Sequence, residues 1–168
     1  MKNRKFYTCC FTGHRPNKLP WKYNENGELF EDIKFKLKTE ILNMISRGYR
    51  HFISGMALGI DILCAELILE FKRKGYKINL ECAVPCNNQT ERWKLNQIQR
   101  YENIIAKADK VTYVSKCKYY NGCMQKRNKY MVDNSNTIIA VYNGEKGGTQ
   151  QTIKYAEMQN LDVIIIEV

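Results

Sequence analysis

The alternation of short apolar runs with longer segments of helical periodicity is the strongest constraint on the fold. Residues 137–141 and 163–166 are almost continuously apolar, without an alternation of period two. Strands buried on both faces of a sheet have this composition, because both rows of their side chains contact helices. Elsewhere apolar residues recur at helical spacing, as at Ile33, Leu37 and Ile41. This alternation predicts an α/β fold: a single Rossmann-like domain with a mainly parallel sheet and helices on both faces.

The expected elements follow one another without a long linker, an internal repeat or a low-complexity stretch. About six strands are expected, over residues 5–11, 51–54, 77–84, 110–115, 137–142 and 162–168. The helices expected between them cover residues 29–47, 60–74, 90–108, 123–133 and 150–159. Because 168 residues fit one domain of ordinary size, residues 1–168 are predicted to form one domain.

The composition is typical of a globular intracellular protein. Hydrophobic residues make up 44% of the chain and charged residues 26%. No run approaches the ~18 apolar residues of a membrane span, and the apolar segment 6–11 is too short for a signal peptide. We therefore expect a cytoplasmic protein with no membrane partner. The net charge of +10 suits an anionic partner, although lysines scattered over helices for solubility would give the same charge.

The seven cysteines favour reduced thiols. An odd number in a chain with its own core argues against a disulfide framework. A zinc site is conceivable from the pairs Cys82-x3-Cys86 and Cys117-x5-Cys123. These spacings are loose and Cys82 falls inside an expected strand, so no metal site is predicted.

Three expected strand-to-helix turns have a composition suited to an anion. They follow the first, second and fifth strands, at residues 12–16, 54–61 and 143–149. In open α/β sheets, ligands bind beyond the carboxyl ends of the strands, where the strand order reverses. Each turn alone is also compatible with an ordinary connection, but three at one edge of a parallel sheet indicate a shared binding site.

The first turn contributes Thr12, Gly13, His14 and Arg15 to this expected site. Gly13 lets the backbone approach a ligand closely, Thr12 can donate a hydroxyl hydrogen bond, and Arg15 can clamp a phosphate. His14 alone does not indicate a base or a metal ligand.

The second turn contributes Ser54, Gly55, Ala57 and Gly59, small residues that expose backbone N–H groups where a helix begins. There the unpaired donors and the helix dipole favour an anion. The spacing is neither a dinucleotide-binding fingerprint nor a P-loop. Asp61 either caps this helix or accepts from a ligand hydroxyl.

The remaining site residues come from the third turn and from two other segments. In the third turn, Gly147 and Gly148 allow close approach and Thr149 stands at the expected helix N-cap. After the third strand, Gln89 can read a polar edge of a ligand, while Trp93 either stacks on its ring or packs its helix onto the sheet. Finally, Arg127 and Asn128 are assigned to phosphate and ribose contacts.

These residues together resemble the YpsA-like branch of the SLOG superfamily. The matching motifs, in chain order, are Thr12-Gly13-His14-Arg15, residues 54–61, Pro85 with Gln89 and Trp93, Arg127-Asn128 with Asp133, and Gly147-Gly148-Thr149. The superfamily includes the DNA-processing protein DprA and the Lonely Guy phosphoribohydrolases. The resemblance spans nearly the whole chain and implies a nucleotide-binding Rossmann-like domain whose ligand is a nucleotide or a nucleotide-derived molecule such as ADP-ribose. Ligand sensing is the usual proposal for this branch, and homo-oligomers are common among related proteins.

One motif departs from the Lonely Guy pattern, Gly-Gly-x-Gly-Thr-x-x-Glu, whose Glu serves catalysis. Thr152 stands where that Glu would fall. The first hypothesis is therefore a ligand-binding or sensing domain with no assigned catalytic residue and no cofactor beyond its ligand. A nucleoside-monophosphate N-glycosidic hydrolase is the second, and it would need Glu81 or Glu157 to replace the missing carboxylate. A DprA-like nucleic-acid-binding module is the third, based on residues 54–61 and the positive charge.

Overall fold

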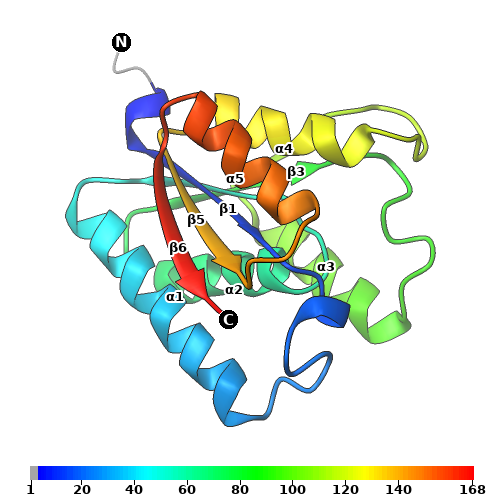
Figure 1. The fold of residues 1–168 in the computed structure, drawn as a ribbon, viewed down its shortest axis with the longest axis horizontal. Helices are drawn as coiled ribbons and strands as arrows, with labels where there is room; N and C mark the ends of the chain where they lie inside the picture. The colour runs from blue at the N-terminus through cyan, green and yellow to red at the C-terminus, as the bar shows by residue number, and fades with distance from the viewer. Residues whose placement is uncertain (1–3) are drawn as a thin grey trace.

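The computed structural model describes residues 4–168 and contains one sheet of six parallel strands (Figure 1). The strands are β1 (Thr8–Gly13), β2 (His51–Ser54), β3 (Asn79–Val84), β4 (Lys110–Tyr113), β5 (Thr137–Tyr142) and β6 (Asp162–Glu167). The α-helices are α1 (Glu28–Ser46), α2 (Ile60–Arg73), α3 (Leu95–Lys107), α4 (Cys123–Asp133) and α5 (Gly148–Met158). Two short 3-10 helices, η1 (Arg4–Tyr7) and η2 (Pro16–Lys18), flank β1. The predicted α/β fold is confirmed.

The strand order is β4-β3-β2-β1-β5-β6. The chain moves outward from β1 to β4 and then returns to the other side of β1, where it adds β5 and β6. The order therefore reverses between β1 and β5, which are paired in parallel with Thr12 opposite Ala140. At such a switch point the connections leave the strand ends in opposite directions, so a crevice opens beyond them.

Helices cover both faces of the sheet. On one face, α1, α2 and α3 enclose the larger core, in which Leu37 of α1 and Phe11 of β1 belong to one buried cluster. On the other face, α4 and α5 enclose a smaller core that contains Met131 of α4 and Cys10 of β1. The neighbours Cys10 and Phe11 thus point to opposite faces, and both are buried. This explains why the strands lack a polar alternate row.

Two element boundaries differ notably from those expected. The first strand begins at Thr8, because η1 occupies the preceding residues. The third helix begins at Leu95, where the Gln97 side chain accepts the Lys94 N–H at 2.9 Å. This contact satisfies a donor at the helix start, and residues 90–93, which were expected to be helical, form a turn and a bend instead.

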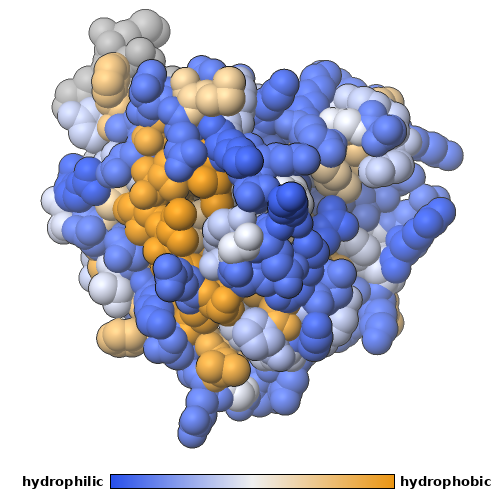
Figure 2. Space-filling model, viewed as in Figure 1, coloured by the Kyte–Doolittle hydropathy of each residue, from blue (hydrophilic) through white to orange (hydrophobic). Residues whose placement is uncertain are grey.

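The edge strand β6 carries an apolar band on the surface. Val163 and Ile164 are half-buried and Ile165 is 47% exposed. Figure 2 shows the band on the face that also displays β6 in Figure 1. No strand pairs with the outer edge of β6 within the described chain, so its outward backbone groups are available to a neighbour. Within residues 4–168, none of the helices has both the length and the apolar character needed to cross a bilayer.

Candidate functional site

Two neighbouring cavities lie at the carboxyl-terminal edge of the sheet. The first has a volume of about 250 Å³ and is lined by the end of β1 and the starts of α2, α4 and α5. The second has a volume of about 350 Å³ and extends from the η2 turn to the segment that follows β3. Arg15, Asn17, Ala57 and Met124 line both cavities, which we call the first and the second cavity.

Most residues assigned to the site from sequence line one of these cavities. The first is lined by Thr12, Gly13, His14, Arg15, Ala57, Asp61, Arg127, Asn128, Gly148 and Thr149. The second is lined by Gln89 and Trp93, together with the shared Arg15 and Ala57. The structure thus brings together segments more than a hundred residues apart. Ser54, Gly55, Gly59 and Gly147 line neither cavity, and they act on the shape of the surrounding turns.

Gly55 and Gly59 allow the loop before α2 to pack closely against its neighbours. Gly59 has a φ of +96°, and a Cβ there would lie 2.7 Å from the His14 carbonyl oxygen. A Cβ on Gly55 would lie 2.7 Å from a guanidinium nitrogen of Arg127. The loop can therefore reach both the β1 turn and α4 only because these positions lack side chains.

The N-terminus of α5 directs backbone donors toward the first cavity. The Gln151 N–H donates to the Gly147 carbonyl at 3.0 Å, so the N–H groups of Gly148 and Thr149 precede the hydrogen-bond ladder of the helix. A Cβ on Gly148 would meet no atom within 4 Å, which leaves this stretch of backbone accessible. The N-cap is Gly147, with φ +153°, and Thr149 is the second helical residue. The expectation that Thr149 is the N-cap was wrong, because the helix includes Gly148.

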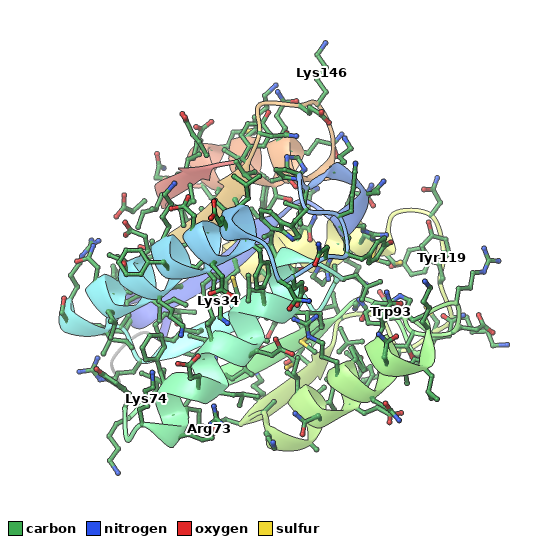
Figure 3. All side chains as sticks on the ribbon, turned by 90° about the horizontal axis from the view of Figure 1, so that it is seen from below. Lys34, Arg73, Lys74, Trp93, Tyr119 and Lys146 are labelled. Atoms are coloured by element: carbon green, nitrogen blue, oxygen red, sulfur yellow. The ribbon has the colours of Figure 1, made fainter. Side chains whose placement is uncertain are left out.

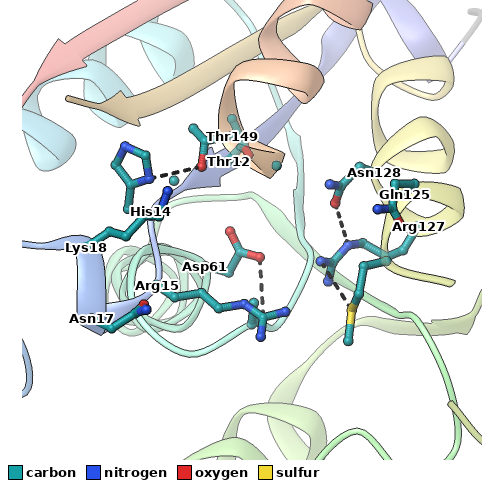
Figure 4. Close-up of a pocket in the computed structure, with 14 residues that line it drawn as sticks. Thr12, His14, Arg15, Asn17, Lys18, Asp61, Gln125, Arg127, Asn128 and Thr149 are labelled. Carbon is teal, nitrogen blue, oxygen red and sulfur yellow. Dashed lines mark hydrogen bonds between the residues drawn. The ribbon is translucent and has the colours of Figure 1, made fainter. Parts of the chain in front are cut away.

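His14 is held as a neutral imidazole between two turns. Its Nε2 accepts the Asn143 N–H at 3.2 Å, so the ring proton is on Nδ1. Nδ1 lies 3.5 Å from Thr149 Oγ1 and can donate to it (Figure 4). Burial lowers the pKa of His14, which keeps the ring neutral. Because Thr149 Oγ1 accepts this bond, its own hydroxyl proton remains available to a group in the first cavity.

The two basic residues of the β1 turn differ in their contacts. Arg15 is exposed and lines both cavities, and its guanidinium forms no hydrogen bond or ion pair with any residue of the described chain. Lys18 Nζ donates to the Lys146 carbonyl at 3.2 Å and lies 3.4 Å from a Glu145 carboxylate oxygen. Lys18 therefore connects the β1 turn to the loop before α5, while Arg15 is free to contact a ligand.

Arg127 is committed to protein contacts. It is 4% exposed, and its guanidinium donates to the Gly55 carbonyl and, at 2.8 Å, to Asn128 Oδ1. Burial lowers the pKa of Arg127, and the charge of Asp61 opposes that shift. These contacts position the loop after β2 against α4. The assignment of Arg127 to a phosphate contact stays a prediction.

Asp61 is buried at the start of α2. Its Oδ2 accepts the Ala57 N–H at 3.3 Å, and Ser54 Oγ donates to its backbone carbonyl at 2.7 Å. Burial raises the pKa of Asp61, while the charges of Arg127 and Arg15 act in the opposite direction. The N-cap of α2 is Gly59, so the carboxylate closes the preceding loop and is not an N-cap side chain.

A hydrogen-bond chain connects α4 to α5 beside the first cavity. Asn128 Nδ2 donates to Thr152 Oγ1 at 3.0 Å, and Thr152 Oγ1 donates to the Gly148 carbonyl at 2.8 Å. Thr152 is 3% exposed and uses its hydroxyl both as donor and as acceptor. It therefore supports the turn at Gly148.

Within residues 4–168, neither glutamate considered as a replacement for the missing catalytic carboxylate lines the first or the second cavity. Glu157 is exposed near the end of α5, whereas the first cavity lies at the start of this helix. Glu81 is buried, and burial alone would raise its pKa, but hydrogen bonds from His51, Tyr130 and Thr112 hold the pKa at about 2. Those bonds measure 2.6 Å, 2.6 Å and 2.7 Å.

Three further observations concern possible chemistry at the site. Within residues 4–168, Asp61 is the only carboxylate that lines either cavity. The same part of the chain holds no group of three or more His, Cys, Asp or Glu side chains placed to bind a metal ion. All seven cysteines are free thiols, and of the four considered for zinc only Cys117 is exposed.

Several residues line the cavities without having been assigned to the site from sequence: Asn17, Lys18, Tyr23, Met124 and Gln125. A signal was present for some of them. Asn17 and Lys18 follow Arg15 and Pro16 directly, and a proline at the start of a short helix keeps these residues near the end of β1. No comparable signal pointed to Tyr23, which belongs to the loop before α1.

Comparison with known proteins relates the chain to one family. A family model named YpsA, described as the YspA SLOG family, matches residues 9–167. The uncharacterized SPbeta prophage-derived protein YoqJ of Bacillus subtilis is 32% identical over 137 residues, which cover 74% of this chain and 80% of that protein. A UPF0398 protein of Bacillus cereus is 29% identical over 155 residues, which cover 89% of this chain and 84% of that protein.

Two solved structures share the fold. DNA processing protein A from Helicobacter pylori, in a structure concerning its single-stranded DNA binding mode, has a TM-score of 0.63 at 17% identity. DprA from Streptococcus pneumoniae has a TM-score of 0.64 at 12% identity. The matches cover 94% and 97% of this chain but only 64% and 51% of the two DprA chains. At these identities the likeness is one of fold.

Proposed function

This chain belongs to the YspA SLOG family, and from this premise we propose that it binds a nucleotide or a nucleotide-derived phosphorylated ligand at the carboxyl-terminal edge of its sheet. One observation carries the proposal. An unpaired arginine, Arg15, and the starts of α2 and α5 line a single cavity although they lie far apart in the sequence. Guanidinium groups and helix N-termini are both common phosphate-binding groups in proteins.

Each group has a distinct role in this proposal. A phosphoryl group accepts hydrogen bonds from the N–H groups of Gly148 and Thr149 and from the Thr149 hydroxyl. Arg15 contacts the same phosphoryl group from the β1 turn. The Asp61 carboxylate is an acceptor, so it suits a ribose hydroxyl rather than a phosphate oxygen.

We propose binding without rapid turnover. Hydrolysis of an N-glycosidic bond needs a carboxylate that stabilises an oxocarbenium-like centre and activates water. Thr152 offers a hydroxyl that is already committed to Asn128 and Gly148. Asp61 is the carboxylate that remains, and its Oδ2 accepts the Ala57 N–H.

Thermal unfolding and titration calorimetry test the proposal directly. The panel contains nucleoside mono- and diphosphates, cyclic nucleotides and ADP-ribose. At about 100 times the Kd, a ligand stabilises the fold by about 2.7 kcal/mol. For a chain of this length, that raises the Tm by roughly 5–10 °C. A panel that produces neither a Tm shift nor heat of binding would contradict the proposal.

A pair of arginine variants tests the location. Arg15→Gln removes the unpaired cation of the site, whereas Arg73→Gln removes an exposed cation at the opposite end of α2, far from Trp93 and Lys146 in Figure 3. We expect Arg15→Gln to weaken binding by about tenfold or more, because hydrogen bonds between charged groups contribute about 1.5–3 kcal/mol. Arg73→Gln should leave the Kd unchanged. Equal losses in both variants would indicate a general charge effect.

The fold shared with DNA processing protein A from Helicobacter pylori favours a second candidate function, binding of single-stranded nucleic acid at the same edge. The net charge of +10 is compatible with it. Salt dependence separates the two candidates, since the logarithm of affinity falls with the logarithm of salt concentration by about 0.7 per phosphate contacted on a single strand. A slope equivalent to several phosphates, with oligonucleotides bound more tightly than mononucleotides, would favour the second candidate.

A further inference from the structure

We propose that the second cavity is a base-binding subsite, in which a planar heteroaromatic base stacks on Trp93 and donates an N–H to Gln89 Oε1. This inference rests on the proposed function, because it places the phosphate of the same molecule in the first cavity. It specifies the ligand as one that carries a base, not merely a sugar phosphate.

The two cavities differ in chemistry in the way that such a ligand requires. Arg15 lines both cavities, but only the first contains the helix donors and the buried carboxylate. Beyond the shared residues, the walls of the second are mostly apolar or aromatic, and they consist of Pro16, Tyr23, Leu58, Gln89 and Trp93. Ligand sites combine apolar walls with a few placed polar groups. A molecule with an anionic end and a flat ring would match both cavities at once.

Trp93 is placed as a stacking platform. Its ring meets Tyr101 of α3 edge to face, with the centroids 5.5 Å apart and an interplanar angle of 87°. Its backbone N–H donates to the Thr90 carbonyl at 2.9 Å, which fixes the turn before α3. The indole is half-buried and still lines the second cavity. The contact with Tyr101 therefore orients the ring and leaves part of it accessible to a ligand.

Gln89 supplies an unused acceptor. Its Nε2 donates to the Met56 carbonyl at 3.0 Å, while its buried Oε1 has no hydrogen-bond partner in the described part of the chain. The amide cannot exchange its two ends without placing oxygen against the Met56 carbonyl. A buried acceptor without a partner costs free energy, and a donor on a ligand would remove that cost.

Met56 adds a local sign of strain at the same place. Its φ is +59°, which is uncommon for a residue other than glycine. Strained backbone of this kind is concentrated at binding and catalytic sites, where the surrounding structure maintains it. Here the residue with left-handed backbone, Met56, also supplies the carbonyl that orients the Gln89 amide.

The test compares AMP, GMP, CMP and UMP with ribose 5-phosphate by calorimetry on the full chain. We expect at least one nucleotide to bind about tenfold or more tightly than ribose 5-phosphate. Trp93→Leu should weaken binding of that nucleotide by at least about fivefold, since base stacking contributes about 1–3 kcal/mol. Ribose 5-phosphate should bind Trp93→Leu and the wild type equally, and Trp93→Phe should retain most of the nucleotide affinity. Gln89→Leu should weaken binding of the nucleotide and leave the affinity for ribose 5-phosphate unchanged.

Fluorescence gives a second readout that does not require a Trp93 variant to fold. Trp21 and Trp93 are the only tryptophans, and Trp21 packs against Phe30 with the ring centroids 5.6 Å apart. In a Trp21→Phe protein, all tryptophan emission comes from Trp93. We expect the bound nucleotide to quench this emission and ribose 5-phosphate at saturation to leave it unchanged.

The outcomes separate this inference from the proposed function. Equal affinity for the nucleotides and ribose 5-phosphate would overturn the base subsite and leave the phosphate site intact. The subsite would also be overturned if Trp93→Leu kept the preference for the nucleotide over ribose 5-phosphate and the nucleotide did not quench Trp93 emission in the Trp21→Phe protein. If neither class of compound binds, the proposed function fails and the subsite fails with it.

Discussion

Gly148 determines how closely a ligand can approach the start of α5. Its φ lies outside the left-handed region, and a Cβ would meet no atom within 4 Å. A valine therefore fits the fold but occupies the space in front of the helix donors. We predict that Gly148→Val weakens binding of the preferred nucleotide by about tenfold or more, because at least one charge-assisted hydrogen bond is lost. Calorimetry measures the change in Kd.

Gly27→Val is the matched control for this variant. Gly27 precedes α1, where a Cβ also meets no atom within 4 Å, and it lines neither the first nor the second cavity. It should keep the wild-type Kd. A folded Gly148→Val protein with normal affinity would show that the N-terminus of α5 is not part of the binding site.

His14 makes stability depend on pH with a definite sign. Burial lowers its pKa in the folded protein below the ordinary value, so the unfolded chain takes up a proton first as the pH falls. The stabilisation by neutral His14 is therefore complete above the ordinary histidine range and declines as the pH falls through it. Urea unfolding at pH 7.5 and 5.5 should show a larger loss of unfolding free energy in the wild type than in His14→Asn. Equal losses would contradict the assigned neutral imidazole.

Single residues of the site could be predicted where the chemistry is local. Glycines, a hydroxyl and an arginine at the end of a strand indicate a phosphate turn without knowledge of their neighbours, and Thr12, Gly13 and Arg15 all line the first cavity. The contacts of Arg127 could not be predicted in this way. They depend on the Gly55 carbonyl, 72 positions earlier in the chain, and on burial that only the assembled sheet produces.

At the scale of elements, the link between α4 and α5 is the most testable contact. The hydroxyl of Thr152 bonds both Asn128 and the Gly148 carbonyl. We predict that Asn128→Ala and Thr152→Val each lower the unfolding free energy by about 1 kcal/mol. The double variant should show a coupling of about 0.5 kcal/mol or more in urea unfolding, because the two side chains are in contact.

Thr39→Val provides the control for that cycle. Thr39 Oγ1 also donates to a carbonyl four residues earlier in its helix, that of Phe35 at 3.0 Å, but it lies on α1, which covers the opposite face of the sheet from α4. The losses of unfolding free energy caused by Thr39→Val and by Asn128→Ala should be additive. Additive effects of Thr152→Val and Asn128→Ala would show that the bond between α4 and α5 contributes little.

The order and type of the elements could be predicted, since periodicity and burial on both faces are visible in the sequence. The boundaries of the elements could be predicted less well where local contacts determine them. The third helix starts at Leu95 because of the Gln97 side chain, and the first strand starts after a 3-10 turn. Neither feature changes the hydrophobic pattern, so neither was visible in it.

At the scale of the molecule, topology decides where the site lies. The sequence does not encode strand order in any local pattern, but the reversal between β1 and β5 places their turns beside each other. The homo-oligomer implied by the family resemblance stays a prediction. The apolar outer edge of β6 is a surface through which two copies could associate.

The whole arrangement favours a binder over a hydrolase. We predict that micromolar protein incubated with AMP, GMP, CMP, UMP or IMP releases no free base at an enzyme-like rate, which would be ~1 s⁻¹ or faster. Proton transfer by a positioned side chain typically raises the reaction rate 10²–10⁴-fold, and the Thr152 hydroxyl cannot supply it at neutral pH. Chromatography measures the products. Rapid base release that is lost in Asp61→Asn would identify Asp61 as the catalytic carboxylate and contradict the prediction.

An amide-resolved NMR titration with the tightest-binding nucleotide is the most direct test of ligand binding at the carboxyl-terminal edge of the sheet, because it reports where the ligand binds as well as whether it binds. We predict saturable shifts that are largest for the backbone N–H groups of residues 12–15, 17–18, 55–61 and 147–150. Shifts spread over the basic surface, or concentrated at the amino-terminal edge of the sheet, would contradict it.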